Sequence, residues 1–467
     1  MTTNRQDTAD DIRVTDLIQK QRYFFSTGAT KAVKFRKEQL RNLRDKIKTN
    51  EQPILDALYR DVRKPPFEAF MTEIGPVLED LKDAIRHVEK WAAPTAMKTP
   101  LSMFPARSKV YHDPYGVALI ISPWNYPFNL LMAPLIGALA AGNCAILKTS
   151  PLAPNTSGAI KELLGSIFPE EYVALVQGHR NVTKALLEER FDYIFFTGGA
   201  TVGKAVYEAA AKYLTPVTLE LGGKSPCIVA DDADIDITAR RLAWGKFVNA
   251  GQTCVAPDYL LISNRVKDKL FSAMILQIER FYGSDPQKSE HYARIISDNH
   301  FDRVSSLMQG CAIVTGGRTD AADRYIAPTI LDDVKLDAPV MQEEIFGPIL
   351  PTITVGAIEE SIEIVNSLPK PLSLYLFTED GELKKKVLNE TSSGGGCIND
   401  TLLHVGNVHV PFGGVGMSGM GAYHGQESFR TFSHRKSIVE KSRWLDNSVR
   451  YPPYSKYGIK LLRILKG

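Results

Sequence analysis

The sequence predicts an α/β fold with doubly wound parallel sheets, and three observations indicate it. From residue 115 onward, short apolar runs alternate with helical or turn-rich segments, a spacing typical of strands in parallel sheets. The chain has 467 residues, so we expect two or three domains, each with its own core. Hydrophobic residues make up 44% and charged residues 23% of the chain, as in an ordinary globular protein.

The first part of the chain is predicted to be helical. Residues 10–60 show helical periodicity with many Lys, Arg and Glu side chains, which indicates amphipathic helices that cover a surface. The polar N-terminus of mixed charge does not resemble a secretory signal. The longest apolar region, 130–147, contains Pro134 and Gly142. We therefore expect a buried helix ending at Gly142, followed by a strand, and no membrane span.

Two series of apolar runs predict two α/β domains that meet near residues 220–224. The expected strands of the first series are 117–121, 144–147, 172–176, 193–196 and 217–219. Those of the second series are 225–230, 259–262, 312–314, 350–354, 374–377 and 396–398. After Thr401 the chain is rich in Gly, His and Val. We interpret this stretch as an extended arm that pairs with another subunit, with Tyr111 in its partner strand.

Charge and cysteine content exclude several classes of protein. A formal net charge of +3 is small for this length and gives no indication of nucleic-acid binding. The five cysteines are scattered and none forms a CxxC pair, so neither a disulfide framework nor a metal site is expected. We therefore expect no bound metal and a reducing, cytoplasmic location.

Two motifs suggest covalent chemistry. Cys254 lies among small residues in GQTCVAP, which leaves room for a substrate, and Glu220 interrupts the apolar run of LELGGKSP. A thiol near a carboxylate that handles water suggests covalent capture followed by hydrolysis. Each residue also has a simpler interpretation, because free cysteines are commonly buried and inert, and a carboxylate in an apolar run is commonly half of a salt bridge.

Four further motifs carry weaker signals. FFTGGATVGK has the strand, glycine turn and helix that let backbone amides hold a phosphate. Asn125 in PWNYPFN is a candidate oxyanion donor, with an Asx-turn cap as the alternative. Lys148 follows a strand and is a candidate ribose ligand, with a snorkelling surface lysine as the alternative. In EEIFGP, Glu344 precedes Phe346 by two positions, an arrangement that suits clamping a sugar and stacking on a ring.

Taken together, the motifs resemble those of the NAD(P)-dependent aldehyde dehydrogenase superfamily, and the resemblance covers nearly the whole chain. PWNYPFNL, FFTGGATVGK, LELGGKSP, GQTCVAPDY, EEIFGPI and PFGGVGMSGMGAYHG occur in the family's order with similar spacing. The segment GMGAYHGQESFRTFSHRK is most similar to the class 3 and fatty-aldehyde branch. The resemblance implies a Rossmann-like cofactor domain, an α/β catalytic domain and a small β-arm for oligomerisation, with a homodimer as the assembly.

The resemblance also implies domain boundaries and residue roles. The NAD(P)-binding domain is expected at 1–95 and 116–220, the catalytic domain at 221–400, the arm at 96–115 and 401–435, and a tail at 436–467. Cys254 would attack the aldehyde, Asn125 and the Cys254 amide would hold the oxyanion, and Glu220 would activate the water that hydrolyses the thioester. The residues expected at the cofactor are Lys148, Gly198, Gly199, Val202, Gly203, Glu344 and Phe346.

One departure from the family pattern concerns the cofactor. Where the family commonly has a glutamate that binds the adenine ribose, this chain has Pro151. Without that carboxylate a 2′-phosphate is not repelled, so we predict that both NAD and NADP are used. The predicted function is therefore oxidation of a medium-chain or long-chain aliphatic aldehyde, or an aromatic one, to the carboxylic acid.

The C-terminal tail and three rival functions stay open. Lys456, Lys460 and Arg463 recur at helical spacing opposite apolar residues, which suits peripheral contact with an anionic membrane. The alternative is docking on the subunit itself or covering the substrate entrance. The apolar residues of the tail are Tyr457, Leu461, Ile464 and Leu465. The rival functions are a CoA-acylating dehydrogenase, which has no use for Glu220, a cofactor-independent thiol hydrolase, which leaves Lys148 unexplained, and a non-catalytic scaffold.

Overall fold

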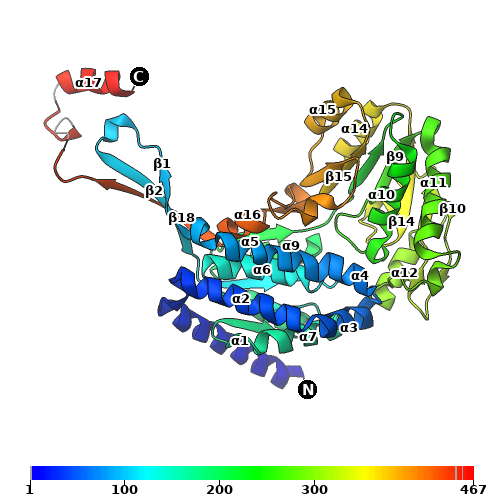
Figure 1. Cartoon of the computed structure of the whole chain (residues 1–467), viewed down its shortest axis with the longest axis horizontal. Helices are drawn as coiled ribbons and strands as arrows, with labels where there is room; N and C mark the ends of the chain where they lie inside the picture. Colours follow the sequence, from blue (N-terminus) through cyan, green and yellow to red (C-terminus); the bar gives the residue numbers. More distant parts are fainter. Residues whose placement is uncertain (1–2, 447–449, 455, 467) are drawn as a thin grey trace.

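The computed structural model describes residues 3–446, 450–454 and 456–466, and these form two α/β bodies and a projecting arm (Figure 1). The helices of the first body are α1 (Thr3–Ser26), α2 (Val33–Thr49), α3 (Glu51–Val62), α4 (Pro66–Ala69), α5 (Gly75–Ala92), α6 (Asn129–Ala141), α7 (Pro154–Gly165), α8 (Arg180–Glu188), α9 (Ala200–Ala211) and α16 (Gly425–Thr431). Helix α6 ends at Gly142, whose φ of 97° is left-handed, as predicted.

The first sheet has a Rossmann-like strand order, β17-β7-β6-β3-β4-β5. Strands β3 to β7 are parallel and confirm the first predicted series. The order reverses between β3 and β6, and ligands bind beyond the carboxyl ends of the strands at such a point. The strands are β3 (Val117–Ile121), β4 (Cys144–Lys148), β5 (Val173–Val176), β6 (Tyr193–Thr197), β7 (Val217–Glu220) and β17 (Gly419–Met420).

The second sheet has the order β10-β13-β14-β9-β8-β15-β16. All six predicted strands are present, but β13 was missed because its short segment gives no long apolar run, and β10 pairs antiparallel with it. The strands are β8 (Pro226–Val229), β9 (Tyr259–Ser263), β10 (Ala312–Thr315), β13 (Thr329–Asp332), β14 (Ile349–Val355), β15 (Ser373–Phe377) and β16 (Gly395–Ile398). The helices are α10 (Ile235–Phe247), α11 (Asn264–Tyr282), α12 (Asp298–Ser306), α13 (Pro339–Gln342), α14 (Ile358–Ser367) and α15 (Gly381–Glu390).

The arm is a three-stranded antiparallel sheet that projects away from both bodies (Figure 1). It consists of β1 (Thr95–Met97), β2 (Ala106–Pro114) and β18 (Ser433–Lys441), and Tyr111 pairs with Lys436. Strand β18 therefore continues past residue 435, where we expected the arm to end. Helix α17 (Lys456–Lys466) lies close to the 101–103 turn of the arm.

The glycine-rich segment 411–425 does not lie in the arm, which corrects our interpretation of it. Its strand β17 pairs with β7 of the same chain, and Gly419 lies opposite Glu220. The segment is held by this pairing because the backbones approach closely: a Cβ on Gly419 would lie 2.2 Å from the Leu219 carbonyl oxygen. Among the described residues, no helix is long and apolar enough to cross a membrane.

Candidate active site

Cys254 lies on a tightly fixed loop that follows α10. Three consecutive residues of the loop are left-handed, with φ of 54° at Asn249, 50° at Ala250 and 72° at Gly251. A Cβ on Gly251 would lie 2.3 Å from the Gly347 carbonyl oxygen, so only glycine fits there. The Gln252 side chain donates to the carbonyls of Asn249 and Arg294, at 3.0 Å each. The backbone that carries the thiol is thus held from several sides.

The Cys254 thiol is partly exposed and is neutral at ordinary pH. Burial, with smaller contributions from the negative charges of Glu344 and Glu220, raises the pKa of Cys254 to about 12. Attack by sulfur therefore requires that a base or a neighbouring positive charge promotes loss of the proton. The electrostatic influence of both carboxyl groups also shows that they share one region with the thiol.

Glu220 ends β7 between two neighbouring strands. It lies opposite Thr197 of β6 on one side and Gly419 of β17 on the other, and only 2% of the residue is exposed. Neither carboxylate oxygen has a hydrogen-bond partner among the described residues, and burial raises the pKa of Glu220 well above its usual value. The alternative interpretation as half of a salt bridge is therefore wrong for the part of the chain that the structure describes. A buried carboxyl without a partner is available to act on water.

Asn125 is bonded directly to the loop of Cys254. Its side-chain amide donates to the Gln252 backbone carbonyl at 3.0 Å. The backbone carbonyl of Asn125 accepts from the Lys64 ammonium and from the Asn249 side-chain amide, both at 3.0 Å. The following helix α6 has no side-chain cap, and the Asn125 side chain donates instead to a residue 127 positions away, so the interpretation as a cap is wrong. One of the two amide hydrogens is used at Gln252, so the other is available to a substrate oxygen.

The turn before α9 offers backbone donors for a phosphate. The Gly198 amide is bonded to the Glu220 carbonyl at 3.0 Å, and the Gly203 amide to the Gly199 carbonyl at 3.0 Å. The amides of residues 200–202, which include Val202, have no acceptor inside the helix and point out of its N-terminus. Gly203 lets the helix approach the strand, since a Cβ there would lie 2.6 Å from the Leu221 side chain. This turn therefore fits a pyrophosphate group.

Lys148 is buried at the carboxyl end of β4, so the interpretation as a snorkelling surface lysine is wrong. Its ammonium donates to the carbonyls of Thr149 at 2.7 Å and Gly178 at 2.8 Å. Burial lowers the pKa of Lys148 to about 8. An ammonium has three hydrogens, and two are used here, so one donor remains for a ribose hydroxyl.

Glu344 packs against the LELGGKSP segment. A Cβ on Gly222 would lie 2.1 Å from a Glu344 carboxylate oxygen, and the other oxygen is buried without a partner among the described residues. Burial raises the pKa of Glu344 to about 8. The orphaned oxygen fits a ribose hydroxyl, which is a donor.

The segment around Glu344 and Phe346 is held by charged side chains. The Lys224 ammonium donates to the Glu343 carbonyl at 2.9 Å and pairs with Asp258 at 2.5 Å, and Arg303 donates to the Ile345 carbonyl at 2.7 Å. The backbone of Phe346 is left-handed, with φ of 49°. Its ring packs edge-on against the Trp124 ring, with 5.3 Å between the ring centroids. Trp124 directly precedes Asn125, so the ring contact brings Phe346 close to the Asn125 segment.

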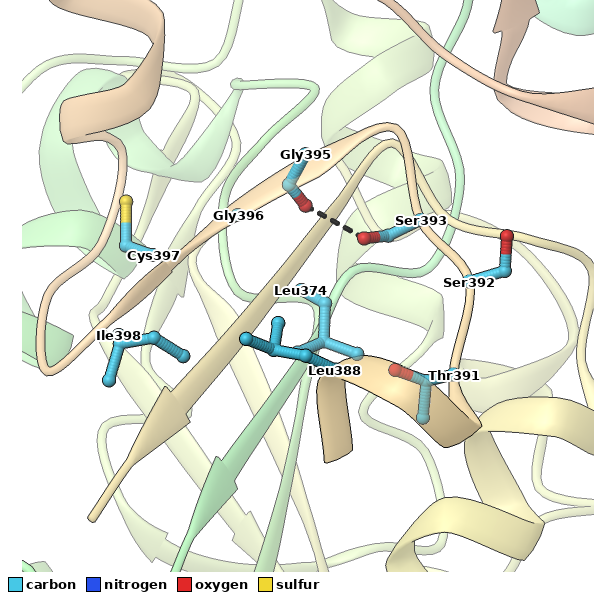
Figure 2. A pocket seen from close by; sticks show the side chains of 9 residues that line it. All are labelled: Leu374, Leu388, Thr391, Ser392, Ser393, Gly395, Gly396, Cys397 and Ile398. Atoms are coloured by element: carbon cyan, nitrogen blue, oxygen red, sulfur yellow. Dashed lines mark hydrogen bonds between the residues drawn. The ribbon is translucent and has the colours of Figure 1, made fainter. Parts of the chain in front are cut away.

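Several residues at the site were missed from the sequence. Lys64, Glu73 and Asn249 form a buried network behind Asn125, and the signal for them was absent because they lie in ordinary helical or loop sequence. No cluster of potential metal ligands occurs among the described residues. A groove of about 360 Å³ beside β16 contains none of the predicted site residues (Figure 2).

Comparison with known proteins places these features in context. The family model described as "Aldehyde dehydrogenase family" matches residues 3–438. The 4,4′-diaponeurosporen-aldehyde dehydrogenase of Staphylococcus aureus is 50% identical over 433 residues, which are 92% of this chain and 94% of that protein. The dimeric NADP-preferring aldehyde dehydrogenase of Canis lupus familiaris is 44% identical over 444 residues, 94% of this chain and 98% of that protein.

A solved structure is also similar. The substrate-bound state of Staphylococcus aureus AldH superimposes with a TM-score of 0.95 at 48% sequence identity. The superposition covers 97% of this chain and 99% of that one, so the arm and both α/β bodies have counterparts there.

Proposed function

The chain belongs to the aldehyde dehydrogenase family, whose members oxidise aldehydes to carboxylic acids with NAD(P)+, and we propose that this protein acts on medium-chain and long-chain aliphatic or aromatic aldehydes through Cys254. The observation that carries the catalytic assignment is the bond between Asn125 and the Cys254 loop, together with an unpartnered Glu220 carboxyl whose charge influences the Cys254 thiol. Nucleophile, oxyanion donor and base then occupy one region.

The side chains support a two-stage reaction. The Cys254 sulfur forms a bond to the aldehyde carbon as its S–H bond breaks, and the carbonyl π electrons move to oxygen. That oxygen, held by the free Asn125 amide hydrogen and the Cys254 amide, takes up the proton as the thiohemiacetal forms. NAD(P)+, when bound, would supply the acceptor for a hydride from the thiohemiacetal carbon, and loss of the oxygen-bound proton to solvent would leave a thioester on Cys254. Glu220 then takes a proton from water and the hydroxide adds to the thioester carbon. The carbon–sulfur bond breaks with its electron pair on sulfur, which takes the proton back from Glu220, so that the acid is released and the thiol is restored.

The residues at the carboxyl ends of the first sheet would hold the cofactor. The Lys148 ammonium has one hydrogen and the Glu344 carboxylate one oxygen that is not bonded within the described residues, and the backbone amides at the start of α9 offer donors for the pyrophosphate. We propose use of both NAD and NADP. Pro151 stands where the family commonly has a carboxylate, and the exposed side chain of Arg180 follows two positions after Gly178, the residue whose carbonyl binds Lys148. A 2′-phosphate at this position would be attracted by the Arg180 guanidinium.

An apolar rim supports the preference for apolar aldehydes. Glu68 accepts a hydrogen bond from the Asn249 amide at 3.0 Å, which places α4 and the following turn beside the nucleophile loop. Phe67 is 80% exposed on this segment, and Phe70 and Met71 are also exposed. Exposed large apolar side chains near a reactive site suit a substrate with an extended hydrocarbon part.

We propose that the protein is a homodimer in which β18 of one subunit pairs with the edge of the partner's second sheet. Strand β18 lies at the edge of the arm and β16 lies at the edge of the second sheet. Val439 in β18 is 56% exposed, and the groove beside β16 offers space for such side chains (Figure 2). Pairing would satisfy the backbone groups of both edges and cover the apolar side chains.

The tail is proposed to contact an anionic membrane surface while the protein otherwise stays in the cytoplasm. Helix α17 is present near the 101–103 turn, and its described residues Tyr457 and Ile464 are 83% and 79% exposed, so these two side chains are accessible to a membrane. The side chains of Leu461 and Leu465 lie outside the described residues. Truncation after Pro453 should reduce binding to vesicles with anionic headgroups and lower activity on long-chain aldehydes. Short-chain activity serves as the control, and unchanged vesicle binding would contradict the proposal.

A panel of aldehydes tests the activity as a whole. Aliphatic aldehydes of increasing length and an aromatic aldehyde are incubated with NAD and with NADP, and the absorbance of the reduced cofactor is followed. We expect turnover with both cofactors and the free acid as product. A product that forms only with CoA would identify an acylating enzyme. Hydrolysis of an ester without cofactor, together with no aldehyde turnover, would identify a thiol hydrolase, and the absence of both activities would indicate a scaffold.

A further inference from the structure

A fully buried ion pair lies behind the oxyanion donor. The Lys64 ammonium contacts the Glu73 carboxylate at 2.6 Å, and both side chains are 0% exposed. Lys64 follows α3 and Glu73 lies in the π-helical turn Phe70–Ile74, so both come from the N-terminal helical region. Moving two charged groups from water into an apolar core costs free energy of desolvation. For this reason a buried ion pair contributes little to the net stability of the fold. The pair therefore invites a functional explanation.

The pair holds the Asn125 loop from both ends. Lys64 donates to the Asn125 carbonyl at 3.0 Å, and its ammonium lies 4.1 Å from the centre of the Tyr126 ring. The second oxygen of Glu73 accepts from the backbone amides of Phe128 at 3.1 Å and Asn129 at 3.0 Å, at the start of α6. A carboxylate at a helix N-terminus is stabilising, and here it also fixes where the helix begins.

The same network continues into the nucleophile loop. The Asn249 side chain donates to the Asn125 carbonyl and to the Gln252 carbonyl, at 3.0 and 3.1 Å. The Tyr126 hydroxyl bonds to the Thr253 hydroxyl at 2.6 Å. A shift of residues 125–129 would therefore move the oxyanion donor relative to Cys254 and strain its loop as well.

We propose that Lys64 and Glu73 are positioning residues for the oxyanion donor, which place the Asn125 amide at the substrate oxygen by fixing the backbone of residues 125–129. The inference rests on the proposed function of Asn125 and Cys254. The Lys64–Glu73 pair would act when Cys254 attacks the aldehyde, whereas Glu220 would act later, when the thioester is hydrolysed. Neither residue contacts the groups assigned to the cofactor, so the pair should influence the rate of attack and not cofactor affinity.

The test uses the double variant Lys64→Met with Glu73→Gln. Both charges are removed together, because loss of one partner would leave the other charge buried and unpaired and would cost about 3–5 kcal/mol. A misplaced oxyanion donor costs about 10²-fold. We expect the pre-steady-state burst of reduced cofactor and kcat to slow together by about 10- to 100-fold, with the KM for cofactor nearly unchanged. Lys64→Arg, which keeps a donor and the charge opposite Glu73, should retain more activity than the double variant.

A matched control separates positioning from general stability. Lys267→Met with Asp332→Asn removes a partly buried pair of 2.9 Å in the second body, and should lower Tm without slowing the burst. Hydrogen–deuterium exchange over residues 123–129 gives a readout that does not depend on activity. Faster exchange there in the Lys64/Glu73 variant supports the inference.

Each outcome has one meaning. A burst rate per folded enzyme equal to that of the unsubstituted protein, or unchanged exchange over residues 123–129, would overturn the positioning role. If the unsubstituted protein oxidises no aldehyde, the proposed function fails, and the exchange experiment still decides whether the pair fixes the loop.

Discussion

Replacement of Glu220 by Gln should separate the two halves of the reaction. The carboxyl is 2% exposed and has no hydrogen-bond partner among the described residues, so the neutral amide of similar size replaces it without breaking an ion pair. Because Glu220 is assigned to water activation alone, capture of the aldehyde and formation of the thioester should continue. We therefore expect a burst of about one reduced cofactor per subunit, followed by very slow turnover.

The size of the effect follows from the role of a general base. Such a group contributes about 10²–10⁴-fold to the rate, which corresponds to about 3–5 kcal/mol at about 1.4 kcal/mol per tenfold change. The steady-state kcat of the variant should fall by that factor. In the unsubstituted protein kcat should rise with pH, because burial raises the pKa of Glu220 and only the ionised form accepts a proton. This rise should be absent in Glu220→Gln.

The assay is stopped-flow absorbance of the reduced cofactor, with acid-quenched mass spectrometry of the protein to detect the thioester on Cys254. Cys254→Ala is the control and should show neither burst nor adduct. If Glu220→Gln also shows no burst, Glu220 is required before hydride transfer, for example to deprotonate the thiol. That result would refute the assignment of Glu220 to hydrolysis alone.

The Glu220→Gln substitution should also change how the stability of the fold depends on pH. An unfolded glutamate has a pKa of about 4.3, and the folded group has a raised one. Between the two values the folded state binds more protons than the unfolded state, so the free energy of unfolding decreases as pH rises through this window. Glu220→Gln removes this contribution, and its Tm should depend less on pH above about 4.3 than that of the unsubstituted protein. Calorimetry at several pH values measures the difference.

Three other predictions concern the cofactor and the assembly. Pro151→Glu should lower kcat/KM with NADP by about tenfold or more while NAD is little affected, since a carboxylate repels a 2′-phosphate; an unchanged ratio contradicts the assignment. Glu344→Gln should weaken cofactor binding by about 10- to 100-fold, the usual worth of hydrogen bonds to a charged acceptor, in calorimetric titration. In the unsubstituted protein affinity should rise as pH passes about 8, where more Glu344 is ionised. Substitution of both Ile438 and Val439, which are exposed on β18, by Lys should shift the protein toward the monomer in analytical ultracentrifugation. A dimer of unchanged stability would exclude β18 from the interface.

Local patterns were sufficient for most of the elements. Apolar runs predicted every strand of the parallel series in both sheets except β13, and Gly142 marked the end of α6 because a left-handed residue there favours glycine. They failed at β13, which is too short to stand out, and at the glycine-rich segment 411–425. That segment looks like a free extended arm in sequence, but its backbone packs against β7.

The sequence by itself determined the α/β class and the two series of strands, and it supplied the candidates proposed as reactive groups, since periodicity and motif chemistry are local properties of the chain. Tertiary structure alone decided that Glu220 has no ion-pair partner among the described residues, that Lys148 is buried and that Asn125 is bonded to the Cys254 loop. It also brought Lys64 to Asn125 across 61 positions. Burial and long-range hydrogen bonds depend on which surfaces meet when the elements pack, and no local pattern encodes that meeting.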